Sequence, residues 1–265
     1  MGTIFAVTNQ KGGVGKTTTV VNLAAAFGKI GKKVLCVDMD PQGNATTGLG
    51  IKKKDLDIST YDIILGKRRI KDCIKATEFE NVYVAGSKAD LAAADVELID
   101  REKRNLRLRM QLLTVKDDYD YILIDCPPSL SLLTINAICA ANSLIIPMLC
   151  DFYSMEGLSQ LMNFTEKINR HNSSSVGVEG ILFTQYDGRL VLTKQVIENV
   201  KSNVTCNIYE TVIPKNVRIS EAPSFGKPVV YYDNASSGSI AYTKLAQEIQ
   251  SRHEKPMQAN YSIQS

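Results

Sequence analysis

Short apolar stretches recur along the chain, and most of them precede a longer segment with apolar residues at helical spacing. Several stretches are apolar at consecutive rather than alternate positions, which is typical of parallel strands covered on both faces. This pattern predicts seven strands, at 3–8, 33–38, 81–86, 119–125, 143–149, 178–185 and 208–214. Helices are predicted at about 16–30, 89–115, 130–141, 155–171, 190–202 and 238–253.

The alternation of strands and helices predicts an α/β fold with a doubly wound, mainly parallel sheet and helices on both faces. Ligands of such sheets bind beyond the carboxyl ends of the strands. With 265 residues, 44% of them hydrophobic, the chain can bury one large core. We therefore expect a single domain, 1–253, followed by a polar tail, 254–265, that frays.

The composition restricts the possible classes of function but does not indicate one. The net charge of +3 is mildly basic, which neither indicates nor excludes a local surface for nucleic acid. The six cysteines are scattered without a C-x-x-C pair, as expected for reduced thiols. No apolar run approaches the roughly 20 residues that cross a bilayer, so no membrane partner is expected.

The segment VTNQKGGVGKTTT follows the first predicted strand and begins the first predicted helix. Its end matches the phosphate-binding pattern G-x-x-x-x-G-K-[ST], except that Gln10 stands where the first glycine is expected. Glycines let the backbone approach an anion, and the N–H groups of the loop and of the helix start can form a phosphate nest. The expected nucleotide-binding residues are Lys11, Gly12, Gly13, Val14, Gly15, Lys16, Thr17 and Thr18.

Two residues of this segment have definite expected roles, and a third is unusual. Lys16 would contact the β- and γ-phosphates, and the Thr17 hydroxyl would bind Mg²⁺. Lys11 is an additional cation four residues before Gly15. A loop lysine is ordinarily just solvated, but here the loop can aim it away from its own nucleotide, toward a γ-phosphate bound by a second subunit.

Five segments carry a resemblance to a known family. KGGVGKTT resembles the deviant Walker A box of the ParA/MinD class of P-loop ATPases, in which the early lysine is the signature. VDMDPQGNATTGLG (37–50) and ILIDCPPSL (122–130) are similar to the Walker A′ and Walker B segments of ParA/Soj proteins. FTQYDGR (183–189) and IPKNVRISEAPSFGKPV (213–229) resemble two further blocks. The chain thus resembles a ParA/Soj-type partition ATPase from residue 3 to about 250.

Carboxylates follow two of the predicted strands. Asp38 and Asp40 come at the end of one strand, where they can orient water or hold the hydration shell of Mg²⁺. The resemblance gives Asp40 the role of positioning the attacking water, with Asp38 as a further metal candidate. Asp125 would hold Mg²⁺ through water, as a Walker B carboxylate does. The expected catalytic residues are thus Lys11, Lys16 and Asp40.

The remaining expected site residues follow from the resemblance alone. In ParA/Soj proteins, the positions of Arg189 and Arg218 bind DNA without sequence preference, and we expect Lys215 and Lys227 to widen that surface. Pro214 and Asn216 fall in the segment that borders the adenine ring.

Two positions depart from the family pattern. Phe225 stands where a histidine is frequent, and Asp151 stands where a glutamate is common. Both concern expected dimer contacts rather than the phosphate chemistry.

The resemblance implies a function and its partners. The protein would hydrolyse ATP to ADP and phosphate with Mg²⁺, for partition of a chromosome or a plasmid. Its ATP-bound sandwich homodimer would bind double-stranded DNA non-specifically, and hydrolysis, stimulated by a centromere-binding ParB-type protein, would release the DNA. The expected location is the cytoplasm, in association with the nucleoid.

Three other functions use related scaffolds. A MinD-like ATPase recruited to the membrane at the division site needs a C-terminal amphipathic helix with a basic face, which SIAYTKLAQEIQSRHEKPMQANYSIQS does not provide. An iron–sulfur carrier needs clustered cysteine ligands. A metabolic ligase of the same class is disfavoured by the DGR and NVRISEAP segments.

Overall fold

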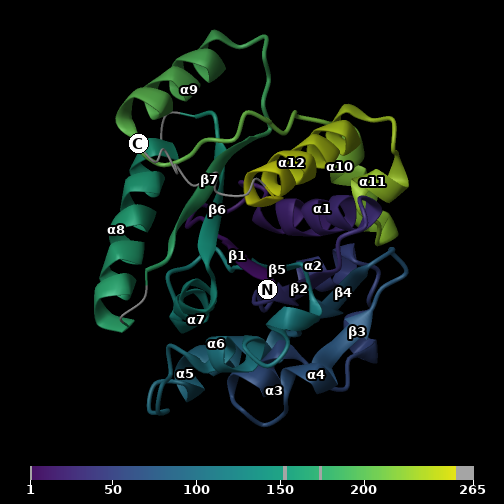
Figure 1. Ribbon diagram of the computed structural model, residues 1–265, viewed down its shortest axis with the longest axis vertical. Coiled ribbons are helices and arrows are strands. Elements are labelled where there is room, and N and C mark those ends of the chain that lie inside the picture. Colours follow the sequence, from purple (N-terminus) through teal and green to yellow (C-terminus); the bar gives the residue numbers. More distant parts are fainter. Residues whose placement is uncertain (1, 152–153, 173–174, 255–265) are drawn as a thin grey trace, which may run out of the picture.

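A computed structural model describes residues 2–151, 154–172 and 175–254. Seven strands form one sheet in the order β3-β4-β2-β5-β1-β6-β7 (Figure 1). All neighbouring strands run parallel except β3 and β4. The strands are β1 (Thr3–Val7), β2 (Val34–Asp38), β3 (Ile74–Ala76), β4 (Val82–Ala85), β5 (Tyr121–Asp125), β6 (Ser143–Leu149) and β7 (Gly177–Thr184).

Helices cover both faces of this sheet. Alternate residues of β1 point to opposite sides: Phe5 and Val7 pack against α1 and α12, whereas Ile4 and Ala6 join the core beneath α7 and α8. The predicted doubly wound fold is therefore confirmed. The helices are α1 (Lys16–Lys29), α2 (Asn44–Gly48), α3 (Thr60–Ile64), α4 (Ile70–Cys73), α5 (Ala94–Glu97), α6 (Arg107–Leu112), α7 (Leu132–Ala140), α8 (Ser154–Asn172), α9 (Val191–Asn203), α10 (Val217–Glu221), α11 (Val229–Tyr232) and α12 (Ser237–Glu254).

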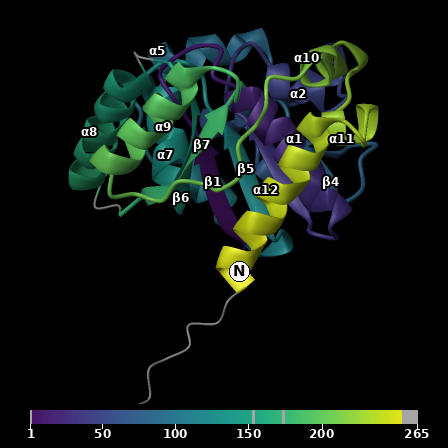
Figure 2. The same cartoon turned by 90° about the horizontal axis from the view of Figure 1, so that it is seen from above.

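Helix α12 packs along α1 and extends beyond the far end of the sheet (Figure 2). The ring of His253, near its C-terminal end, lies edge-on to Phe5 of β1 with 5.5 Å between ring centroids. Helix α12 ends at Glu254, one residue beyond the domain boundary predicted at 253. The rest of the predicted polar tail, 255–265, lies outside the described residues.

Six of the seven predicted strands are confirmed, and the seventh, 208–214, is wrong. This segment runs beside β7 but forms only isolated bridges with it. Tyr209 and Ile213 donate backbone hydrogen bonds to β7, at 3.0 and 2.8 Å. Between them, the N–H groups of Glu210 and Thr211 donate to the carboxylate of Glu248 on α12, at 2.9 and 3.0 Å. The ladder is interrupted because the Thr211 N–H, which a regular strand would direct at β7, donates to a side chain instead.

The single helix predicted over 89–115 is also wrong. The chain forms a 3₁₀ turn at Ala89–Ala93 and the short helices α5 and α6, with turns over 98–106 between them. Lys103 in this stretch has a left-handed backbone (φ 51°), which ends helical propagation. The charged sequence DREKRN favours solvent over a buried helix face.

None of the described helices is long and apolar enough to cross a membrane. The parallel register brings the carboxyl ends of the central strands level, with Asp125 opposite both Val7 and Asp38. The loop after β1 and the acidic ends of β2 and β5 therefore meet at one edge, where the functional site is expected.

Replacing Glu248 tests the interruption of the seventh strand. We expect Glu248→Ala to lower the free energy of unfolding by about 1–3 kcal/mol, because the part-buried N–H of Thr211 and the exposed N–H of Glu210 lose their acceptor. Urea unfolding followed by circular dichroism measures the change. Glu198→Ala, on the exposed side of α9, is the control, and equal stability of the two variants would contradict this account.

Candidate nucleotide site

The loop between β1 and α1 adopts a conformation that only its glycines allow easily. Gly13 and Gly15 have φ values of 73° and 89°, in the left-handed region. The end of β7 holds the loop from the side: the Thr184 hydroxyl donates to the carbonyl of Val14 at 2.8 Å, and the Gln185 amide donates to the carbonyl of Gly13 at 2.9 Å. These two supports were not predicted, although they lie at the carboxyl end of a correctly predicted strand.

Lys16 begins α1 and is buried. Its Nζ donates to the carbonyl of Lys11 at 3.0 Å, across the loop. Burial lowers the pKa of the Lys16 ammonium, and the carboxylates of Asp125 and Asp40 oppose this shift. The ammonium lies inside the loop, as a phosphate contact requires, and Thr17 and Thr18 follow it in the first helical turn.

Lys11 is held on the opposite side of the loop. Its Nζ lies 2.5 Å from Oδ2 of Asp151, in the segment after β6. Partial burial acts to raise the pKa of Asp151, but hydrogen bonds from Lys11 and Ser154 outweigh it, so the pKa is lowered. The backbone N–H of Lys11 donates to Asn9 Oδ1 at 3.0 Å, and Asn9 in turn donates to the carbonyl of Pro147 at 2.8 Å.

Asp125, the last residue of β5, is fully buried. Neither of its carboxylate oxygens has a hydrogen-bond partner among the described residues. Burial raises the pKa of Asp125 well above its usual value, and the adjacent Asp38 adds to the effect, while Thr17 and Lys16 act against it. A buried carboxylate without partners is costly, and a cation would relieve that cost.

Asp38 is equally buried, but its carboxylate is occupied. Oδ2 accepts hydrogen bonds from both the N–H and the hydroxyl of Thr46, at 2.8 and 2.7 Å, and Oδ1 accepts from the N–H of Asp40 at 3.2 Å. Burial raises the pKa of Asp38 to about 6, although the Thr46 hydrogen bonds act to lower it. These hydrogen bonds allow Asp38 to anchor the loop that carries Asp40. Because its carboxylate oxygens are already occupied, the structure does not support the metal-binding role suggested for Asp38.

Asp40 itself is nearly buried, and its Oδ1 accepts from the N–H of Gln42 at 2.8 Å. The second carboxylate oxygen is available at the same edge of the sheet as the glycine loop. Thr46, whose hydroxyl also accepts from the N–H of Ser87 at 2.9 Å, was missed by sequence reasoning. Its place within the Walker A′ segment was the only signal.

The residues present suit Mg²⁺ held jointly with a nucleotide. The described part of the chain contains no group of three or more His, Cys, Asp or Glu side chains that could hold a metal alone. Mg²⁺ usually keeps several waters and binds one or two carboxylates together with substrate phosphates. Asp125 and the Thr17 hydroxyl are oxygen donors of this kind, beside the glycine loop.

A cavity of about 340 Å³ adjoins the start of α1. Gly15 and Thr18 line one side of it, and Pro214 and Asn216 line another. The structure thus brings the predicted adenine-bordering residues next to the phosphate loop. The Asn216 side chain is already engaged: Oδ1 accepts from the N–H of Arg218 at 2.8 Å, and Nδ2 donates to Ser237 Oγ at 2.8 Å.

The four predicted DNA-binding residues lie on two adjoining segments. One segment contains Arg189, and the other contains Lys215, Arg218 and Lys227. A backbone hydrogen bond joins them, from the N–H of Lys215 to the carbonyl of Tyr186 at 3.0 Å. All four residues are exposed. Both arginines are nevertheless ion-paired, Arg189 with Asp187 at 2.6 Å and Arg218 with Glu221 at 2.8 Å.

The fold and the glycine loop define a P-loop ATPase, and comparisons with known proteins agree. A family profile described as an AAA domain matches residues 2–178. The sporulation initiation inhibitor protein Soj of Bacillus subtilis is 52% identical over 249 residues, covering 94% of this chain and 98% of Soj. The chromosome partitioning protein ParA of Myxococcus xanthus is 44% identical and covers 95% of this chain and 89% of ParA. The chain therefore belongs to the ParA/Soj family of chromosome-partitioning ATPases.

Solved structures show the same fold, in one case with a bound nucleotide. Cobyrinic acid a,c-diamide synthase from Mycobacterium smegmatis, with bound ADP and magnesium, has a TM-score of 0.85 at 30% identity and covers 96% of each chain. The cell division ATPase MinD of Pyrococcus furiosus has a TM-score of 0.77, also at 30% identity, and covers 95% of this chain and all of MinD. Both identities are lower than the 52% shared with Soj, which favours partition over the ligase and MinD-like alternatives.

The unpaired carboxylate of Asp125 leads to a prediction about stability. In the metal-free protein, Asp125→Asn should raise the free energy of unfolding at neutral pH by about 1–3 kcal/mol, since the burial that raises the pKa of Asp125 outweighs the stabilising effect of Lys16 and Thr17 on its charge. An exposed aspartate has a pKa of about 3.9. Because the folded-state pKa of Asp125 is higher, the folded protein holds this proton more tightly, and ionisation destabilises it as pH rises above about 4.

The advantage of Asp125→Asn should therefore grow from about pH 4 toward neutrality, which urea unfolding at several pH values measures. Mg²⁺ with ADP should stabilise the wild type more than the variant, which keeps the phosphate loop but lacks the carboxylate expected to hold Mg²⁺. The exposed Asp117→Asn serves as the control. A variant that is less stable than the wild type at every pH would disprove the role of the unpaired charge.

Proposed function

We propose that this protein forms an ATP-bound sandwich dimer that binds DNA without sequence preference and releases it on hydrolysis. The observation that carries the proposal is the position of Lys11. One loop supplies two lysines, yet their ammonium groups separate: Lys16 turns into the loop, while Lys11 reaches Asp151 outside it. A lysine that does not serve its own phosphate loop is free to serve that of a partner.

The Lys11 side chain can exchange Asp151 for a phosphate bound by a facing subunit. Its side chain and that of Asp151 are 37% and 35% exposed, so the ion pair is accessible to solvent and weak enough to exchange. A γ-phosphate bound by a facing subunit carries more charge than one carboxylate and would compete for the ammonium. ATP and dimerisation then become linked, because the phosphate that is cleaved also holds the two subunits together.

The hydrolysis step uses residues of one subunit together with Lys11 of the other. We assign Lys16 and the N–H groups of the glycine loop to the phosphates, and Asp40 to orientation of the attacking water. Asp125 and Thr17 would hold Mg²⁺, which neutralises charge on the phosphates when bound. Asp38 and Thr46 keep the Asp40 loop in place. Pro214 and Asn216 would border the adenine ring.

Dimerisation would also supply the DNA affinity that one subunit lacks. The net charge of +3 gives a single chain few phosphate contacts. Two copies of the surface formed by Arg189, Lys215, Arg218 and Lys227 on one rigid body roughly double the logarithm of the electrostatic binding constant. Such side chains contact phosphates rather than bases, so the binding does not depend on DNA sequence. Non-specific binding of this kind would place the protein on the nucleoid.

The proposal includes a partner that stimulates hydrolysis, a ParB-type centromere-binding protein. Support comes from relatives named for chromosome partitioning, among them ParA of Caulobacter vibrioides, which is 43% identical over 258 residues. Release of DNA would follow when hydrolysis separates the subunits.

Co-sedimentation with DNA or with anionic liposomes tests the proposal. We expect DNA of arbitrary sequence to capture the protein only with ATP and Mg²⁺, and liposomes to capture none. Arg218→Glu should keep ATP-dependent dimers but lose at least tenfold in DNA affinity, since a phosphate contact becomes repulsive in both subunits. Arg101→Glu, an exposed change of the same charge, is the control. Capture by liposomes alone would favour the MinD-like alternative.

Lys11→Ala tests the transfer of the ammonium to the partner. This variant should bind one nucleotide per subunit with near-normal affinity, yet remain monomeric with ATP and lose about 10³-fold or more in turnover, the usual effect of removing a cation supplied in trans. Sedimentation velocity and phosphate release measure the two effects. Lys54→Ala, on an exposed turn, controls for the loss of one charge. Normal dimerisation of Lys11→Ala would refute the proposal.

A further inference from the structure

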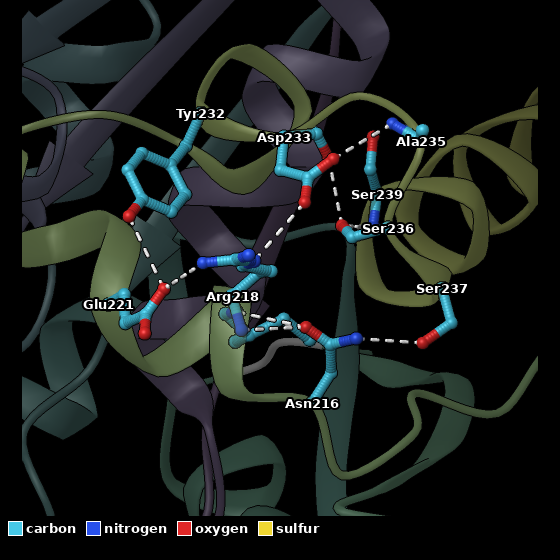
Figure 3. A network of polar contacts seen from close by, with 10 residues as sticks. Asn216, Arg218, Glu221, Tyr232, Asp233, Ala235, Ser236, Ser237 and Ser239 are labelled. Carbon is cyan, nitrogen blue, oxygen red and sulfur yellow. Dashed lines mark hydrogen bonds and ion pairs between the residues drawn. The ribbon is translucent and has the colours of Figure 1, made fainter.

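Arg218 is held between two carboxylates (Figure 3). Its Nη1 donates to Oε2 of Glu221, one turn further along α10, at 2.8 Å. Its Nε lies 3.3 Å from Oδ2 of Asp233, in the turn between α11 and α12. The Arg218 side chain is still 52% exposed. An anion could therefore still approach this side chain from solvent.

Both carboxylates are fixed around this guanidinium. The Tyr232 hydroxyl donates to Oε2 of Glu221 at 3.3 Å, and Asp233 Oδ1 accepts from the N–H of Ala235 at 3.2 Å. An ordinary surface pair joins two flexible side chains and is easily exchanged for water. Here, two carboxylates bind one arginine, and each carboxylate also accepts a further hydrogen bond. The three charged groups together carry a net negative charge, the opposite of what a phosphate contact needs.

The second expected DNA contact is neutralised in the same manner. Nε and Nη2 of Arg189 donate to the two carboxylate oxygens of Asp187, at 2.8 and 2.6 Å. This is the bidentate geometry in which a guanidinium binds a phosphate. The two arginines of the proposed DNA surface thus already hold carboxylates in the places that phosphate oxygens would take.

We propose that Glu221, supported by Asp233, competes with DNA phosphates for Arg218 and sets the affinity of the DNA surface. The inference rests on the proposed function, because it presumes that Arg218 binds DNA. Each phosphate contact of the two arginines must displace or share a carboxylate, so the gain that these contacts bring to one subunit is small. Only a dimer, which presents the surface twice, collects enough contacts to bind. The carboxylates therefore help to make DNA capture depend on ATP.

Glu221→Gln tests this competition, because it removes one charge and keeps the length and hydrogen-bonding capacity of the side chain. With Mg²⁺ and a non-hydrolysable ATP analogue, we expect DNA affinity to rise about threefold to tenfold over two subunits. The gain should shrink at high salt, where exposed charges are screened. Without nucleotide, weak capture by DNA should become detectable. Fluorescence anisotropy with a labelled duplex of arbitrary sequence measures these affinities.

Two controls separate competition from a general charge effect. Glu102→Gln makes the same change of net charge in the turn between α5 and α6 and should leave DNA affinity unchanged. In an Arg218→Ala background, Glu221→Gln should produce no gain. Circular dichroism melting establishes that each variant is folded.

The possible results are distinct. A Glu221→Gln variant that binds DNA as the wild type does, or more weakly, would mean that Glu221 is neutral or orients Arg218, and would overturn the competition alone. A gain that persists without Arg218, or that Glu102→Gln reproduces, would also overturn it. If the wild type fails to bind DNA with the analogue, the proposed function falls, and this inference falls with it.

Discussion

A carboxylate that the protein itself does not satisfy underlies the chemistry of this site. Parallel pairing of β5 with β1 and β2 places Asp125 at the level of the glycine loop and beside Asp38. Both acidic groups are fully buried, but only Asp38 receives hydrogen bonds from the loop that follows it. The strand register therefore creates a site whose charge is incomplete without a cation. Lys16 and Thr17, at the start of α1, are the neighbours that favour the charged form of Asp125.

The central part of the fold could be predicted because its signals are local. Consecutive apolar residues indicated six buried strands, and the glycine pattern located the phosphate loop between a strand and a helix. The errors involve contacts distant in the chain. Glu248 captures two amides of 208–214 some 37 residues away, and neither sequence pattern nor propensity registers such a contact. β3 was missed because three residues at the sheet edge carry too little periodicity.

In the candidate site, too, local features could be predicted and contacts between distant segments could not. The residues of the loop were identified from their own sequence pattern, whereas the groups that hold them in place were not. Thr184 and Gln185 support the loop from β7, and Asp151 pairs with Lys11 from the segment after β6. These supports come from segments far from the loop in the chain, so only the folded sheet brings them together. The pairing of Arg218 with Asp233 likewise depends on the turn between α11 and α12.

The interruption of the 208–214 segment by Glu248 has a consequence for how this chain avoids aggregation. An outer parallel strand with a full row of unpaired N–H and C=O groups is a template on which another molecule can add a strand. Here the outer side of β7 is covered by a chain that is itself irregular, and the opposite border of the sheet is a three-residue antiparallel strand. Neither border presents a long, regular ladder. Association between copies by indiscriminate strand addition is thereby disfavoured.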